Sequence, residues 1–229
     1  MISQEYAPGR LVDVHGDGQD GVVVMWHGRG PNERAAMGPL ARAVASSGVR
    51  VCAADWDSTA SDHGRADVLG SLGHARRLAE DLGIPANDVV VVGWSLGATA
   101  ALSLAVGPDG PGHTVLLAPG DGPRAVSAIT GEPLPAQFTP PAGPSSIDIL
   151  HGSRDGISHP ALVRGLAARL RAAGWAPTLT ELPVDHAGIV RLAHDPETQL
   201  YVAAEDPGIV EAGERVVATI VAAASPASS

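Results

Sequence analysis

Three residues of this chain have the types and the order that nucleophilic catalysis by a hydroxyl group requires: Ser95, Asp155 and His186. A serine hydroxyl is a poor nucleophile at neutral pH, so it needs a base that accepts its proton and a third group that orients that base. When the serine lies in a G-x-S-x-G turn, an acid and then a histidine follow it along the chain. The sequence supplies both partners in that order.

The serine lies in a stretch that gives this motif its structural meaning. Val89 to Val92 form a continuous β-branched run, which predicts a strand buried on both faces. The turn Gly93-Trp94-Ser95-Leu96-Gly97 follows, and an Ala/Leu-rich segment that favours a helix begins directly after it. Strand and helix must pass so close that a side chain on either flanking glycine would clash. The helix N-terminus, with its free N–H groups, suits a developing oxyanion.

The two partners follow later strands. Asp155 ends the segment His-Gly-Ser-Arg-Asp, just past a predicted strand that ends at Leu150, and His186 follows a predicted strand that ends near Leu182. The carboxyl ends of parallel strands meet at one edge of a sheet, where sites in open α/β sheets form. We therefore expect Ser95, Asp155 and His186 to meet at that edge.

Other residues compete for the same roles. Asp148 lies inside a predicted strand and Asp185 adjoins the histidine, so neither suits the orienting role as well as Asp155. Among the histidines, His159 and His194 are the alternatives to His186, and we expect His194 to lie on the surface late in a short helix.

Two further groups of polar residues could have a functional or a structural role. One group is four residues after the third predicted strand, and the other is two histidines that precede glycines at strand ends. The first group could suggest a metal site, but its spacing fits no established ligand pattern. We expect a solvated polar loop that lines the cleft: Asp55, Asp57, Asp62 and His63. We interpret His27 and His151 as structural residues that hold loops through hydrogen bonds.

Strands and helices alternate along the whole chain, which predicts one α/β domain over residues 1–229 with a doubly wound, mostly parallel sheet and helices on both faces. Strands are expected at 10–14 (a weak edge strand), 21–26, 49–54, 89–92, 113–118, 147–150 and 177–182. Helices are expected at 32–47 with Asn32 as N-cap, 65–82, from directly after Ser95 to about 107, 160–174 and 208–223, with short ones near 124–130 and from 188. The Pro/Gly-rich stretch 119–144 is a possible small flap, and we expect the tail 225–229 to fray.

Composition narrows the possible partners. The formal net charge of −10 argues against nucleic acid and anionic membranes. The first residues lack a basic segment followed by an apolar one, and no apolar run reaches membrane-spanning length, so we expect a cytoplasmic protein. Composition leaves the oligomeric state open.

These motifs together resemble the α/β-hydrolase superfamily over nearly the whole chain. The matching segments are HGRG at 27–30, GWSLG at 93–97, HGSRD at 151–155 and DHAG at 185–188. The resemblance implies Ser95 as nucleophile, Asp155 as acid, His186 as base, and an oxyanion hole built from the backbone N–H groups of Arg29 and Leu96. Within the superfamily the chain is most similar to small esterases and dienelactone-hydrolase-like proteins without a large cap. It differs from dienelactone hydrolases in using Ser in place of Cys, and from the lipase HGGG loop in carrying Arg29.

The expected activity is hydrolysis of carboxylic esters of small substrates through an acyl-enzyme, with no metal and no organic cofactor. A thioesterase, amidase or perhydrolase would use the same triad, and a non-catalytic binding protein could keep the fold. Candidate substrate contacts are Arg29, Trp94 and Phe138. Arg29 either binds an acidic substrate group or points to solvent.

Overall fold

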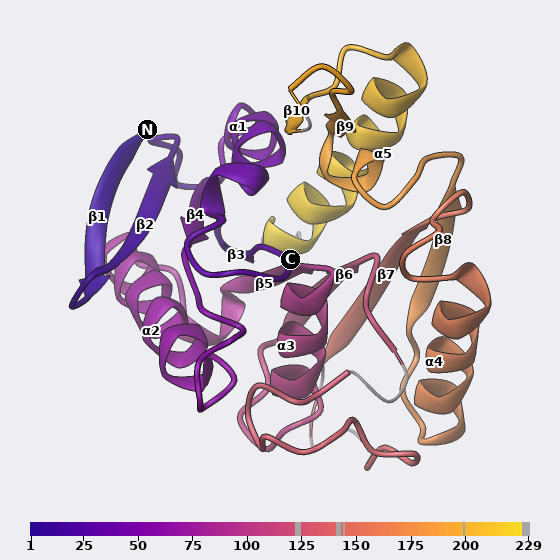
Figure 1. Cartoon of the computed structure of the whole chain (residues 1–229). Helices are drawn as coiled ribbons and strands as arrows, with labels where there is room; N and C mark the ends of the chain where they lie inside the picture. Colours follow the sequence, from indigo (N-terminus) through magenta and orange to yellow (C-terminus); the bar gives the residue numbers. More distant parts are fainter. Residues whose placement is uncertain (122–124, 141–142, 144, 199, 226–229) are drawn as a thin grey trace.

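A mostly parallel sheet crosses the middle of the molecule in the computed structural model, which describes residues 1–121, 125–140, 143, 145–198 and 200–225 (Figure 1). Within these residues the sheet has eight strands. The first two neighbouring pairs in the order given next are antiparallel, and all other pairs are parallel. Their order across the sheet is β1 (Ile2–Ala7), β2 (Arg10–His15), β4 (Arg50–Ala54), β3 (Val22–Trp26), β5 (Val90–Trp94), β6 (His113–Leu117), β7 (Ser146–Gly152) and β8 (Thr178–Leu182).

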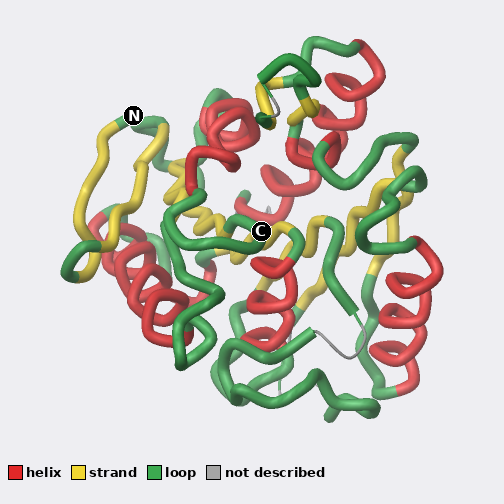
Figure 2. The backbone as a smooth tube through the Cα atoms, viewed as in Figure 1, coloured by secondary structure: helices red, strands yellow, loops and turns green. Residues whose placement is uncertain are grey.

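Helices cover both faces of the sheet, as the alternating sequence pattern predicted (Figures 1 and 2). One face carries α1 (Gly38–Ala45) and α5 (Pro207–Ala224), and the other carries α2 (Arg65–Asp81), α3 (Leu96–Ala105) and α4 (Pro160–Ala172). The predicted doubly wound fold, with no large cap, is confirmed.

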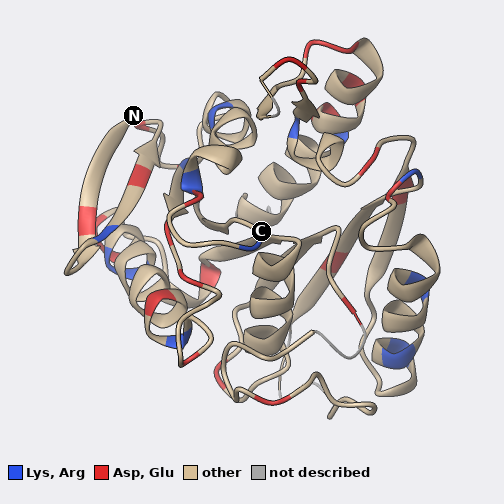
Figure 3. Cartoon of the chain, in the orientation of Figure 1, with Lys and Arg blue, Asp and Glu red and all other residues tan. Residues whose placement is uncertain are grey.

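The alternation of side chains along the central strands explains why two layers of helices are needed. Val24 and Trp26 of β3 belong to the core beneath α2, α3 and α4, whereas Val23 and Met25 belong to the core beneath α1 and α5. All five residues of β3 and of β5 are buried. These strands and β6 contain no Asp, Glu, Lys or Arg, so charge is confined to other parts of the chain (Figure 3). No helix in the described residues has both the length and the apolarity to span a membrane.

The N-terminal region differs from the prediction in two places. The edge of the sheet is β1, and β2, predicted as the edge, lies inside it. Asn32 does not cap a long helix: it has a positive φ of 57°, and its side-chain oxygen accepts a hydrogen bond from Arg10. The predicted helix is a short 3₁₀ helix, η1 (Arg34–Met37), followed by α1. A second short 3₁₀ helix, η2 (Ala86–Asp88), precedes β5.

The segment after β8 contains elements that the sequence did not reveal. A 3₁₀ helix, η3 (Gly188–Val190), takes the place of the predicted short helix. It leads into an antiparallel hairpin of β9 (Leu192–His194) and β10 (Tyr201–Ala203), which precedes α5. The predicted short helix at 124–130 begins outside the described residues, and Val126 forms an isolated bridge to Pro133. Within the predicted tail, residues 226–229 also lie outside them.

Candidate active site

Ser95 occupies a strained turn between β5 and α3. Its φ and ψ are 56° and −117°, a combination that non-glycine residues rarely adopt and that is common at functional sites. The backbone on both sides is fixed, because the Ser95 N–H donates to the Leu117 carbonyl at 2.9 Å and the Ser95 carbonyl accepts from Ala98 and Thr99. The turn therefore holds the serine at the carboxyl edge of the sheet, directly before the first turn of α3.

The two glycines of the turn lie where a side chain has no room. A Cβ atom at Gly93 would lie 2.1 Å from the Gly97 carbonyl oxygen. A Cβ atom at Gly97 would lie 2.3 Å from the Trp26 carbonyl oxygen and 2.4 Å from that of His27. The predicted crowding at the flanking positions is present, and at Gly97 the obstacle is the neighbouring strand β3.

Asp155 and His186 come together through a buried hydrogen bond. The Nδ1 atom of His186 lies 2.7 Å from Oδ2 of Asp155. The other carboxylate oxygen of Asp155 accepts from the backbone N–H groups of Ile157 at 2.8 Å and Ser158 at 2.9 Å. Asp155 is 3% exposed, so this pair is shielded from water.

The surroundings of Asp155 keep it ionised. Burial alone would raise the pKa of its carboxyl group, but the hydrogen bond from His186 and those from Ser158 and Ile157 lower it below the usual value. A carboxylate facing Nδ1 fixes the imidazole with its proton on that atom, which leaves Nε2 free to accept a proton.

Trp94 fixes the loop that carries His186. Its Nε1–H donates to the His186 carbonyl oxygen at 2.9 Å, and the two rings lie 5.4 Å apart at a tilt of 38°. Trp94, directly before Ser95, therefore contacts His186 at two points: the backbone carbonyl and the imidazole ring. Ser95 and His186 line the same cleft, which has a volume of about 860 Å³.

The HGRG loop packs against Ser95. A Cβ atom at Gly28 would lie 3.3 Å from Cβ of Ser95, so the loop approaches as closely as its glycine allows. In the described residues the N–H groups of Arg29 and Leu96 donate to no protein acceptor. Free backbone donors on the two segments that meet at a serine are what an oxyanion hole requires.

His27 holds this loop in place, as predicted. Its Nδ1–H donates to the Gly28 carbonyl at 2.9 Å, and its Nε2 accepts from the N–H groups of Glu33 and Trp56. An imidazole that donates at one nitrogen and accepts at the other is neutral. Burial lowers the pKa of His27 to about 4, which agrees with that state.

These features were compared with known proteins. The model of the alpha/beta hydrolase family matches residues 23–228. The chain belongs to the alpha/beta hydrolase family. No curated protein sequence matches it.

Among solved structures, the hydrolase is similar to a thermophilic esterase, Est2, from the planctomycete Thermogutta terrifontis, with 15% identity, a TM-score of 0.74 and coverage of 100% of this chain and 95% of that one. A structure of the same organism's esterase 2 phosphonylated by cyclosarin gives 17% identity, a TM-score of 0.70 and coverage of 96% and 91%. MGS-M1, an alpha/beta hydrolase enzyme from a Medee basin deep-sea metagenome library, gives 14% identity, a TM-score of 0.69 and coverage of 96% and 97%. At these identities the likeness concerns the fold.

The residues that competed in the sequence with Asp155 and His186 have other positions or hydrogen-bond partners in the structure. Asp148 binds Nε2 of His113 at 2.6 Å and also accepts from Thr178, and Asp185 accepts from the backbone of Gly188. His159 caps α4 by accepting from Ala161. His194 is exposed as predicted, but it lies in strand β9 and not in a helix.

His151 differs from its predicted role. It is fully buried, but within the described part of the chain neither ring nitrogen has a hydrogen bond of normal geometry. Its Nε2 lies 3.8 Å from Oδ2 of Asp155, and burial lowers its pKa. The side chain packs beside Asp155, and in the described residues it lacks the hydrogen bonds of normal geometry by which His27 holds its loop.

The polar residues after β4 organise this part of the backbone. Asp55 is buried and forms an ion pair with Arg34, so it is not the solvated residue that the sequence predicted. Asp57 accepts from Thr59 and pairs with Arg10, while Asp62 accepts from backbone N–H groups that begin α2: those of Gly64 and Ala66.

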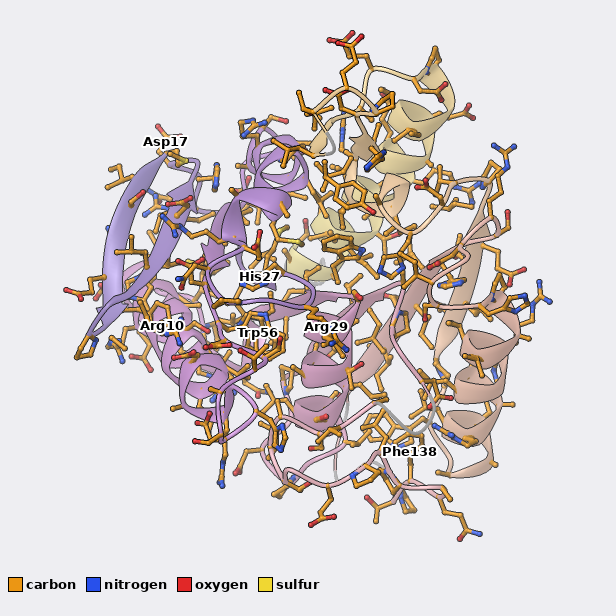
Figure 4. The ribbon with its side chains drawn as sticks, in the orientation of Figure 1. Arg10, Asp17, His27, Arg29, Trp56 and Phe138 are labelled. Carbon is orange, nitrogen blue, oxygen red and sulfur yellow. The ribbon has the colours of Figure 1, made fainter. Side chains whose placement is uncertain are left out.

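The three predicted substrate contacts fall in different places. Arg29 and Trp94 line the cleft, and Arg29 also borders a smaller cavity of about 150 Å³. Phe138 lies far from Arg29 in Figure 4, is not among the described residues that line the cleft, and packs in the core with the Arg169 guanidinium 5.4 Å above its ring. The prediction that Phe138 contacts substrate is not supported, because its ring faces the core. The cleft is lined instead by apolar residues of the hairpin β9–β10 and of the loop before α4.

Proposed function

We propose that this chain is a serine esterase that hydrolyses carboxylic esters of small substrates through an acyl-enzyme on Ser95. The observation that carries the proposal is the buried 2.7 Å hydrogen bond between Asp155 and His186 in the cleft that also contains Ser95. Membership of the alpha/beta hydrolase family and the likeness to esterase structures support it.

In the first half of the reaction, His186 removes the proton from Ser95 as the serine oxygen attacks the ester carbonyl. In the described residues no hydrogen bond joins Ser95 to His186, and such bonds often tighten only when substrate binds. The negative charge that forms on the carbonyl oxygen is stabilised by the N–H groups of Arg29 and Leu96. The carbon–oxygen bond to the alcohol then breaks, and His186 gives its proton to the leaving oxygen.

In the second half, a water molecule takes the place of the alcohol. His186 accepts a proton from this water as it attacks the acyl-enzyme, and it returns the proton to Ser95 when the acid is released. Asp155 remains ionised and stabilises the imidazolium that forms twice in the cycle. Each oxyanion donor contributes on the order of 3 kcal/mol to transition-state stabilisation in enzymes of this kind.

The direct test of the nucleophile is covalent labelling. The protein is treated with a fluorophosphonate ester, and intact and peptide masses are measured. We expect one adduct on Ser95 and none on Ser95→Ala. Ser153→Ala, which removes an exposed hydroxyl near Asp155, is the matched control and should label fully. Absence of an adduct on the folded wild-type protein, or an equal adduct on Ser95→Ala, would exclude Ser95 as the nucleophile.

Labelling does not distinguish esters from other acyl donors. Matched acetyl compounds that differ only in the leaving atom, namely an oxygen ester, a thioester and an amide, are therefore compared by kcat/KM. We expect the protein to hydrolyse the oxygen ester, and we expect this hydrolysis to depend on Ser95. A thioester or amide preference of more than tenfold, corrected for intrinsic reactivity, would assign the triad to one of the alternative activities instead.

A further inference from the structure

One wall of the cleft carries large apolar side chains that remain exposed to solvent. Ile157 is 69% exposed and Leu200 is 63% exposed, and Leu162 and Tyr201 are also exposed. These four residues, called here the apolar wall, all line the cleft that contains Ser95 and His186. Single exposed apolar residues are ordinary on protein surfaces, but a group of them around a reactive serine indicates a binding surface.

The apolar wall is built by the two segments that follow the acid and the base. The N–H of Ile157 donates to Asp155, so this residue is fixed by the same carboxylate that orients the imidazole. Leu200 and Tyr201 lie on the hairpin that follows His186, and this hairpin is closed by β9–β10 pairing and by the hydrogen bond from Asp195 N–H to the Leu200 carbonyl. The wall therefore comes from the same two segments that carry Asp155 and His186, which puts it on their side of the sheet edge.

Different side chains line the cleft on the side of the oxyanion loop. This side contributes three charged residues: Arg29, Glu33 and Arg42. Its apolar residues are smaller ones from η1 and α1: Ala35, Ala36 and Pro39. Charged groups and smaller apolar residues therefore lie on the side of the oxyanion loop, whereas the large exposed apolar side chains come from the segments that follow Asp155 and His186. An ester bound with its carbonyl oxygen in the oxyanion hole would place its two ends in different surroundings.

The chemistry decides which end lies on the histidine side. When the bond from Ser95 Oγ to the carbonyl carbon has formed, the bond to the alcohol oxygen breaks, and that oxygen takes the proton that His186 removed from Ser95. The leaving oxygen must therefore lie within hydrogen-bond reach of His186. We propose that the leaving alcohol is a substantial apolar group that lies against the apolar wall, so that the preferred substrates are esters of long-chain or ring-containing alcohols. This inference rests on the proposed esterase function and adds the substrate class.

Two ester series test the assignment. One varies the alcohol from methyl to octyl with acetate fixed, and the other varies the acid from acetate to octanoate with methanol fixed. We expect kcat/KM of the wild type to rise on the order of threefold per added methylene in the alcohol series until the wall is covered. The acyl series should not show this rise.

The variants Leu162→Ser and Tyr201→Ser are compared with Leu69→Ser. Leu69 is an exposed leucine of α2 that is not among the described residues lining the cleft, so it controls for loss of surface hydrophobicity. We expect the ratio of octyl acetate to methyl acetate hydrolysis to fall about tenfold in each wall variant and to stay at the wild-type value in Leu69→Ser. Melting temperatures confirm that all three variants fold.

The possible failures are distinguishable. The wild type could hydrolyse methyl acetate but show no preference for octyl acetate, or a preference that Leu162→Ser and Tyr201→Ser do not change. Either result overturns the inference and leaves the esterase proposal intact. If the wall variants lose activity only within the acyl series, the wall binds the acid part of the ester, and the inference is also overturned. A folded wild type that hydrolyses no member of either series removes the esterase proposal, and the inference with it.

Discussion

His27 and Trp56 are joined by two hydrogen bonds that connect the oxyanion loop to the end of β4. The backbone N–H of Trp56 donates to Nε2 of His27 at 3.3 Å, and the indole Nε1–H of Trp56 donates to the His27 carbonyl oxygen at 3.0 Å. Figure 4 shows both residues close to Arg29, whose backbone N–H is one of the two donors proposed for the oxyanion. The first of these bonds exists only while His27 is neutral, which makes the loop sensitive to acid.

Acid should therefore destabilise the protein through His27. The unfolded imidazole has a pKa of about 6.5, and burial lowers the folded value to about 4. Between these values the unfolded state binds more protons, so the free energy of unfolding falls as pH falls from about 6.5 to 4 and is constant below. The expected loss between pH 7 and pH 5 is roughly 2 kcal/mol, because each tenfold rise in proton concentration within that range favours the unfolded state by about 1.4 kcal/mol.

The contribution of His27 is isolated with His27→Gln, which retains an acceptor and does not titrate. Urea unfolding of both proteins is measured at pH 7 and pH 5. Histidines 15, 74 and 151 also have pKa values lowered by burial, but they are common to both proteins. The decrease in the free energy of unfolding between pH 7 and pH 5 should be smaller in His27→Gln by roughly 2 kcal/mol. Equal losses in the two proteins would show that His27 is not held neutral.

Gly97 should be intolerant of even one added carbon. The Cβ of Gly97→Ala would meet the carbonyl oxygens of Trp26 and His27, which belong to backbone that cannot move aside cheaply. We expect a loss of several kcal/mol in unfolding free energy, as for other overpacked or strained core sites. The matched control is Gly165→Ala on α4, where a Cβ meets nothing within 4 Å and helix propensity predicts a gain of up to about 1 kcal/mol. Similar stabilities for the two variants, measured by urea unfolding, would contradict the crowding argument.

The turn around Ser95 could be predicted from sequence because its causes are local. The valine run, the two glycines and the helix-forming segment lie next to one another, and each specifies its own conformation. The strands that precede Asp155 and His186 were predictable for the same reason, and the topology of a parallel sheet places the ends of these strands together. Local patterns were therefore enough to place Ser95, Asp155 and His186 at one edge of the sheet.

The missed features depend on contacts between residues distant in sequence. Asn32 has the residue type of a helix N-cap, but its side chain is bound to Arg10 on β2, and η1 begins two residues later. Strands β9 and β10 have only three residues each and are stabilised by pairing with one another, so neither has a periodic pattern of its own. A single phenylalanine such as Phe138 does not indicate whether its ring faces a cleft or a core.

Asp155→Asn should reduce kcat by about three to four orders of magnitude with little change in KM. The amide would present its NH₂ or oxygen to His186 Nδ1 without the charge that stabilises the imidazolium, and corresponding changes in serine hydrolases with a triad have this effect. Asp148→Asn is the control, because Asp148 is bound to His113 and Thr178 away from the cleft. Steady-state kinetics on one neutral ester, together with melting curves, decide the matter. Equal losses of kcat in the two variants would remove Asp155 from its role.

Arg29 provides the last test, which concerns the charge of the substrate. Its side chain is exposed, lines the cleft, and has no ion pair with any described residue. Such a guanidinium can bind a carboxylate with two hydrogen bonds, whereas the N–H proposed to bind the oxyanion belongs to the backbone and survives substitution. If Arg29 binds an acidic group of the acyl part, the kcat/KM ratio of a hemisuccinate ester to the matched butyrate ester should fall about tenfold in Arg29→Gln. The ratio should not change in Arg215→Gln, which removes an exposed arginine of α5 that is not among the described residues lining the cleft. An unchanged ratio in Arg29→Gln would show that this side chain points to solvent and does not bind the substrate.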